Sequence, residues 1–156
     1  MEYEKTFLNL LEGLAQSLQM PEIGVSEDGR ESILVIGDFE VVLRCLDTES
    51  LLIFTVVAPL PEYGREHLMA QLLDANTFLI ATEGFTLGAS EDTGVTLQGI
   101  ASVRVLGRDD IGAFVQRFIS VAGRWQQVCL DIEDLISKAQ AEFTQDTVMQ
   151  PMNIRV

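Results

Sequence analysis

The stretch from residue 32 to residue 58 reads SILVIGDFEVVLRCLDTESLLIFTVVA and decides the fold. It divides into three runs rich in β-branched and aromatic residues, namely Ser32 to Ile36, Phe39 to Leu46 and Leu51 to Ala58. Gly37 and Asp38 form a two-residue hairpin connection, and the polar residues 47–50 form a four-residue turn. Because short connections join antiparallel strands, this stretch predicts a three-stranded antiparallel meander.

Both faces of the meander are largely apolar. The two-residue connection places Ile36 opposite Phe39, and the four-residue turn then fixes the face of each residue in the third strand. One face is wholly apolar and is expected to form the core: Leu34, Ile36, Phe39, Val41, Leu43, Cys45, Leu52, Phe54 and Val56. The second face, interrupted by Glu40, Arg44 and Thr55, carries seven further apolar residues: Ile33, Val35, Val42, Leu46, Leu51, Ile53 and Val57.

The second face allows two interpretations. An antiparallel sheet that faces water usually carries polar side chains on that side. Either helices cover both faces of this sheet, or a partner chain covers part of the second face. In the second case, the seven apolar residues of that face bind a partner segment laid over them in extended conformation. A register slip of one residue would exchange the two faces.

Helices and two further strands surround the meander. Apolar spacing predicts helices over residues 3–19 and 62–80, strands over 85–89 and 95–105, and a last helix from residue 111. The order α-β-β-β-α-β-β-α predicts one α+β domain with an antiparallel sheet over residues 1–143, followed by a flexible tail at 144–156. A last helix of about 30 residues is about 45 Å long and would protrude if straight, so it either breaks or packs beyond its own monomer.

The charge of the chain limits its partners. There are 24 acidic and 10 basic residues, which give a net charge of -14. Nucleic acid and anionic membranes are therefore poor partners. No run approaches the roughly 20 apolar residues that cross a bilayer, and the acidic N-terminus differs from a signal peptide. We expect a cytoplasmic protein in which Cys45 and Cys129 are buried and reduced.

The residues offer no recognisable set for catalysis. His67 is the only histidine, so a histidine metal cluster is excluded. Residues 83–88, EGFTLG, lack the lysine and the helix start of a phosphate-binding loop. Glu91 and Asp92 lack the other ligands of a calcium loop. We therefore expect no enzyme activity, no cofactor and no metal site.

Residues 72–130 carry the most specific pattern. It consists of Leu72-Leu73-x-Ala75-Asn76-x-Phe78, Gly84-x-Thr86-Leu87-Gly88, an acidic turn, an alternating strand, and a last helix with Phe118, Ala122 and Trp125. With these elements in this order, the chain resembles the class I type III secretion chaperones, the Tir-chaperone (CesT-like) family. The resemblance extends over residues 3–132. The chain continues past Trp125 for longer than is usual in that family.

The resemblance implies a bacterial, cytoplasmic homodimer without catalytic activity. Such a chaperone binds an extended N-terminal segment of a secreted effector and keeps it soluble and competent for secretion. The resemblance places the dimer interface on the middle helix and the neighbouring strand: Leu68, Leu72, Leu73, Asn76, Leu79, Phe85 and Leu87. The alternative is a YbjN-like regulatory or sensory protein that has the same fold and no secretion client.

Overall fold

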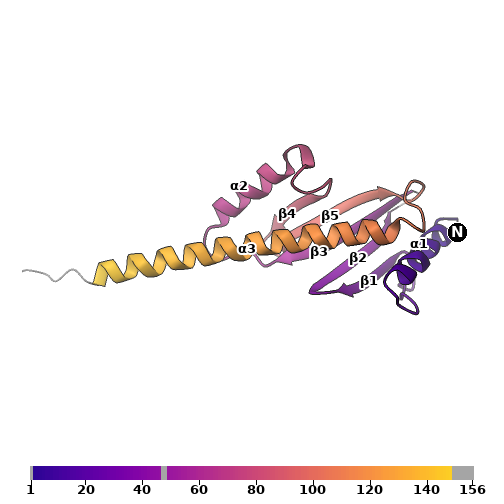
Figure 1. Ribbon diagram of the computed structural model, residues 1–156, viewed down its shortest axis with the longest axis horizontal. Coiled ribbons are helices and arrows are strands. Elements are labelled where there is room, and N and C mark those ends of the chain that lie inside the picture. The colour runs from indigo at the N-terminus through magenta and orange to yellow at the C-terminus, as the bar shows by residue number, and fades with distance from the viewer. Residues whose placement is uncertain (1, 47–48, 149–156) are drawn as a thin grey trace, which may run out of the picture.

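The computed structural model describes residues 2–46 and 49–148 (Figure 1). The elements follow the expected order, with one short 3-10 turn added after the second helix. They are α1 (Glu2–Ser17), β1 (Glu31–Ile36), β2 (Phe39–Leu46), β3 (Ser50–Ala58), α2 (Arg65–Asn76), the 3-10 turn (Thr77–Leu79), β4 (Thr86–Ser90), β5 (Gly94–Ser102) and α3 (Ile111–Val148). The α+β fold class is confirmed.

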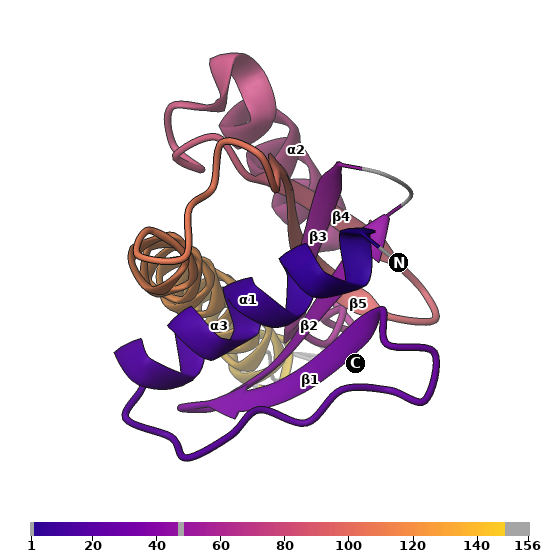
Figure 2. The ribbon, with the colours of Figure 1, turned by 90° about the vertical axis from the view of Figure 1, so that its right-hand side faces the viewer.

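One antiparallel sheet contains all five strands, in the order β1-β2-β3-β5-β4. Helices α1 and α3 pack together over one face of the sheet, which we call the inner face (Figure 2). Helix α2 packs against β4, at one edge of the sheet. The expected hairpin between β1 and β2 is confirmed, because Ile36 pairs with Phe39.

The expected register of β3 was wrong by one residue. Leu46 pairs with Ser50, so three residues rather than four separate β2 from β3. An odd connection length turns the third strand over. Leu51, Ile53 and Val57, which the sequence placed on the second face of the meander, are therefore on the inner face. All three are buried in the core. Three residues expected in the core instead face outward: Leu52, Phe54 and Val56.

Helix α2 is shorter than the helix expected over residues 62–80. It begins after Gly64, whose φ of 76° lies in the left-handed region, and it ends at Asn76. Phe78 and Leu79 then have φ angles of 59° and 54°, which no helix continues through. The 3-10 turn and the bend that follows carry the chain towards β4.

Helix α3 is continuous over 38 residues. At 1.5 Å per residue it is about 57 Å long, and Figure 1 shows it projecting far beyond the sheet and α2. Residues 144–148, which we expected in the tail, are its last turns, and residues 149–156 lie outside the described part of the chain. Within the described residues, no helix combines the length and the apolar character needed to cross a bilayer.

Two glycines bring α1 close to the start of α3. A Cβ atom on Gly13 would collide with the main-chain carbonyl of Arg108, and a Cβ atom on Gly112 would collide with Ser17. The core lies between these helices and the inner face. It includes Cys45 and Cys129, which are buried and free. Burial raises the pKa of both thiols, that of Cys129 to about 11.

Candidate functional site

The outer face of the sheet, opposite α1 and α3, is open to solvent. Val35 in β1 keeps 76% of its surface exposed, and Ile100 in β5 keeps 68%. In the part of the chain that the structure describes, helices therefore cover only the inner face of the sheet, and the interpretation that they cover both faces is wrong. The apolar side chains of this outer face are Ile33, Val35, Val42, Leu46, Leu52, Phe54, Val56 and Ile100.

These side chains form a continuous band across four strands. Ile33 is paired with Val42, Val42 with Phe54, and Leu52 with Ile100, so the apolar surface crosses from β1 to β5. Arg44 interrupts the band, and its guanidinium lies 3.3 Å from the carboxylate of Glu31. An exposed apolar band of this kind is typical of a surface that binds another protein.

The β1 edge of the sheet offers open main-chain groups. The Ser26 N–H donates to the Glu31 carbonyl at 2.8 Å, and the Glu31 N–H donates to Ser26 Oγ at 2.9 Å. The polar main-chain groups of Glu31 therefore point away from β2. Because this direction alternates along an antiparallel strand, those of Ile33 and Val35 point the same way. Among the described residues, no hydrogen bond uses these groups at the edge.

The opposite edge, at β4, is blocked at Leu87 by a side chain. Asn76 Nδ2 donates to the Leu87 carbonyl at 2.9 Å, and the Leu87 N–H donates to Asn76 Oδ1 at 2.9 Å. The side-chain amide of Asn76 thus makes the pair of hydrogen bonds that a neighbouring strand would make. Asn76 therefore links α2 to β4 within one subunit. The family resemblance had placed this residue in the dimer interface and did not indicate this role.

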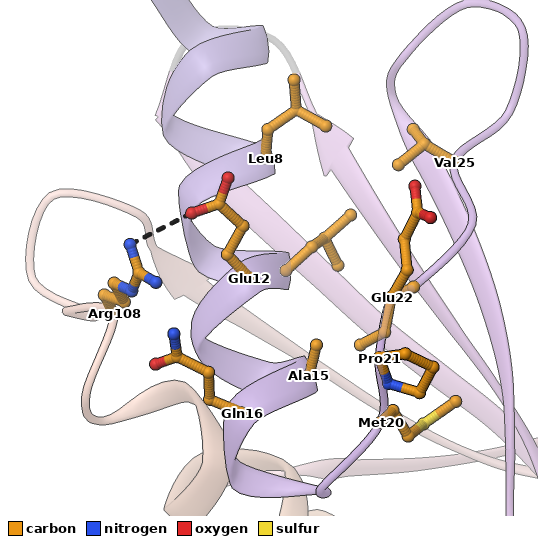
Figure 3. Close-up of a pocket in the computed structure, with 11 residues that line it drawn as sticks. Leu8, Glu12, Ala15, Gln16, Met20, Pro21, Glu22, Val25 and Arg108 are labelled. Atoms are coloured by element: carbon orange, nitrogen blue, oxygen red, sulfur yellow. Dashed lines mark ion pairs between the residues drawn. The ribbon is translucent and has the colours of Figure 1, made fainter.

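A groove between α1 and residues 20–25 adds a second concave surface, lined by both apolar and polar side chains (Figure 3). Its volume is about 580 Å³, and its walls include Leu8, Leu11, Ala15, Met20 and Ile23. At one side Arg108 forms an ion pair with Glu12, with 3.1 Å between nitrogen and oxygen. The sequence predicted no element over residues 20–25 and so did not reveal this groove, although Ile23 and Val25 are apolar.

The residues expected at the dimer interface divide into two groups. Leu68, Leu72, Phe85 and Leu87 are buried within their own chain, so in the free subunit they are core residues. The ring of Phe85 contacts the rings of Phe114 and Phe118 edge-on, which fixes the start of β4 against α3. Leu73 and Leu79 are exposed, so in the free subunit they are open to contact with another molecule.

Phe78 and Ile80 extend the exposed group, and the sequence pattern did not single them out for this role. Phe78 keeps 87% of its surface exposed and has a left-handed backbone, as does Leu79. Such a conformation is strained for large side chains. We call Leu73, Phe78, Leu79 and Ile80 the α2 patch.

The sequence matches a known protein family over most of its length. Residues 9–126 match the model of the Tir chaperone protein (CesT) family. The chain belongs to this family. As a member of this family, the protein is a type III secretion chaperone that binds effectors. The family match does not favour the alternative of a YbjN-like regulatory or sensory protein. No curated protein sequence matches the chain significantly.

Solved structures share the CesT fold at low sequence identity. The structure of the ExsC–ExsE complex matches with 23% identity and a TM-score of 0.69, over 83% of this chain and 97% of that chain. The HopA1–SchA chaperone–effector complex matches with 20% identity and a TM-score of 0.62, over 81% and 94%. The type III secretion chaperone SycH of Yersinia pestis, in complex with a fragment of YscM2, has 18% identity and a TM-score of 0.61, over 74% and 96%.

The described residues hold few groupings of side chains that could bind a metal or act in catalysis. No cluster of three or more His, Cys, Asp or Glu side chains among them has the geometry of a metal site. His67 Nε2 lies 3.0 Å from Gln71 Nε2 on the exposed side of α2. The family is one of chaperones, and the candidate binding surfaces of this chain are the outer face, the β1 edge, the groove beside α1 and the α2 patch.

Proposed function

We propose that this secretion chaperone, located in the bacterial cytoplasm, holds an extended N-terminal segment of its effector along the β1 edge. The segment adds to the sheet as a further strand and lays alternate side chains on the outer face. The observation that carries the proposal is the coincidence of two features at Ile33 and Val35. Both residues have open main-chain groups at the edge and exposed apolar side chains on the outer face.

Main-chain hydrogen bonds at the β1 edge and apolar contacts on the outer face contribute differently to effector binding. Main-chain hydrogen bonds hold an effector segment extended whatever its sequence, because every residue except proline carries the same N–H and C=O groups. The apolar band adds affinity, at about 1.5–3 kcal/mol for each aliphatic side chain that becomes fully buried. Val42, Leu46, Leu52, Phe54, Val56 and Ile100 extend this surface beyond the edge strand. An effector held in this way remains unfolded and soluble.

The protein acts as a homodimer in this proposal, with the α2 patch as the contact between the two copies. Burial of Leu73, Phe78 and Ile80 against a second copy removes large apolar side chains from water. It also offsets the backbone strain at Phe78 and Leu79. The buried residues Leu68, Leu72, Phe85 and Leu87 belong to the core of each subunit, and Asn76 fixes the end of α2 to β4.

The effector site can be tested by photo-crosslinking in the source bacterium. The photoreactive residue p-benzoylphenylalanine replaces Val35, or replaces Glu66 on the exposed side of α2 as a matched control. We expect a crosslinked client from position 35 and none from position 66, with the crosslink in the N-terminal segment of a protein that appears in the secreted fraction. A crosslink of equal yield from both positions, or to the interior of a folded protein, would contradict the proposal.

A further inference from the structure

The last helix carries one apolar seam along its whole length. Starting at Ile111, apolar residues recur at alternating spacings of four and three: Ile111, Val115, Phe118, Ala122, Trp125, Cys129, Ile132, Ile136, Ala139 and Phe143. This is the heptad pattern of a helix that pairs with another helix along its side. The first seven of these residues are buried in the core.

The seam continues where the domain ends. Ile136 is half-buried because it packs on Gly64 at the start of α2. Beyond it, residues 137–144 are all exposed, and Leu135 beside the seam keeps 67% of its surface exposed. Figure 1 shows this part of α3 standing clear of the sheet. It also lies outside the match to the CesT family, which ends at residue 126.

The charges beside the exposed seam indicate the kind of partner. In a helix pair, the positions next to the seam meet those of the other helix. Here these positions are Glu133, Leu135, Gln140 and Glu142, which are two acids and no base. Lys138, the base in this part of the helix, lies away from the seam. A second copy of α3 would therefore bring no opposite charge to these acids, whereas a helix with basic flanks would.

We propose that residues 132–144 of α3 bind a basic amphipathic helix of a partner protein. The apolar side of that helix packs on Ile136, Ala139 and Leu135, and its lysine or arginine side chains pair with Glu133 and Glu142. The contact covers about two heptads, so it is weak on its own and depends on salt. It is separate from the outer face, the β1 edge and the α2 patch, so it leaves the effector site accessible.

The test uses two synthetic peptides and the full-length ¹⁵N-labelled protein. Both peptides have three heptads with leucine at the seam positions, one with lysine and the other with glutamate at the flanking positions. Titrations are followed by NMR, which detects weak binding and locates it. We expect the lysine peptide to shift resonances of residues 132–144, with an affinity at least about tenfold above that of the glutamate peptide.

Matched variants separate the flanking charges from the overall charge. Glu133→Lys with Glu142→Lys reverses the charge beside the seam, whereas Asp131→Lys with Asp134→Lys makes the same change in net charge elsewhere on the helix. We expect the first pair to reverse the preference between the peptides and the second pair to keep it. Equal binding of both peptides, equal effects of the two pairs, or concentration-dependent shifts of residues 132–144 without peptide would each overturn the proposal. The last result would identify a second copy as the occupant.

Discussion

Two neighbouring leucines of α2 allow folding and dimerisation to be separated. Leu72 is 4% exposed and belongs to the core of its own subunit, whereas Leu73 is 71% exposed and belongs to the α2 patch. Each is replaced by glutamate, which is a good helix former, so the substitution itself does not disturb the helix. The two variants have the same composition and the same charge.

The expected costs differ because the environments differ. At position 72, the substitution loses about 1.5–3 kcal/mol of apolar transfer free energy, and an unpaired buried charge costs about 3–5 kcal/mol more. Together these equal much of the 5–15 kcal/mol by which a typical domain is stable. At position 73, the cost to the free subunit stays within about 0.5 kcal/mol, as at other exposed sites. In the dimer, two symmetry-related copies of Leu73 are lost, which weakens association by about a hundredfold or more.

The assays are thermal unfolding by circular dichroism and light scattering over a range of protein concentrations. We expect Leu72→Glu to be largely unfolded or insoluble, and Leu73→Glu to be folded and monomeric. Gln71→Glu, which adds an acid on another side of α2, is expected to remain folded and dimeric. If Leu73→Glu dimerises as strongly as the unmodified protein, the α2 patch is not the interface. If Leu72→Glu melts at an unchanged temperature, the orientation of α2 is wrong.

Three further substitutions test other parts of the structure. Ile53→Asp should unfold the protein, whereas Phe54→Asp should leave it folded but abolish effector capture. If thermal melting shows that Phe54→Asp unfolds and Ile53→Asp stays folded, the register of β3 is in error. Val35→Pro removes one main-chain donor at the β1 edge, so capture should weaken about tenfold with little change in melting temperature, whereas Val35→Ala should have a smaller effect on capture. Burial raises the pKa of Cys129 from 9.0 to about 11. The buried, protonated thiol therefore makes its full contribution to the free energy of unfolding below pH 9, and this contribution is lost as the pH rises towards 11. Cys129→Ala should remove this part of the alkaline loss in urea titrations, and an identical loss in both proteins would refute the assignment.

Most of the element order could be predicted from the sequence, but the faces of β3 could not. Leu51, Leu52, Ile53 and Phe54 are all apolar, so the alternation that normally marks the inner face is absent. The assignment then depended on the length of one polar connection. An error of a single residue moved three of the seven proposed binding residues into the core.

The sites made by tertiary contacts were equally difficult to predict. Large side chains avoid left-handed conformations, so nothing in the residues at 77–80 predicted that α2 would end before them and leave Phe78 exposed. The asparagine that closes β4 could be read as an ordinary helix-end residue. The periodicity of α3 predicted a helix of about 45 Å, too long for a compact domain of this size, but left open whether it breaks. The structure has one continuous helix of 38 residues.

The unequal edges of the sheet determine how many strands the protein can accept. In the terms of polymer chemistry, a subunit with two open edges is divalent and can propagate into a fibre, whereas a subunit with one open edge is monovalent and stops after one addition. Asn76 makes each subunit monovalent in this sense, because it bonds both outward main-chain groups of Leu87, in the middle of the β4 edge. Each subunit can thus offer the β1 edge to an effector segment while Asn76 blocks strand addition at its β4 edge. Its resistance to polymerisation depends on α2 remaining docked.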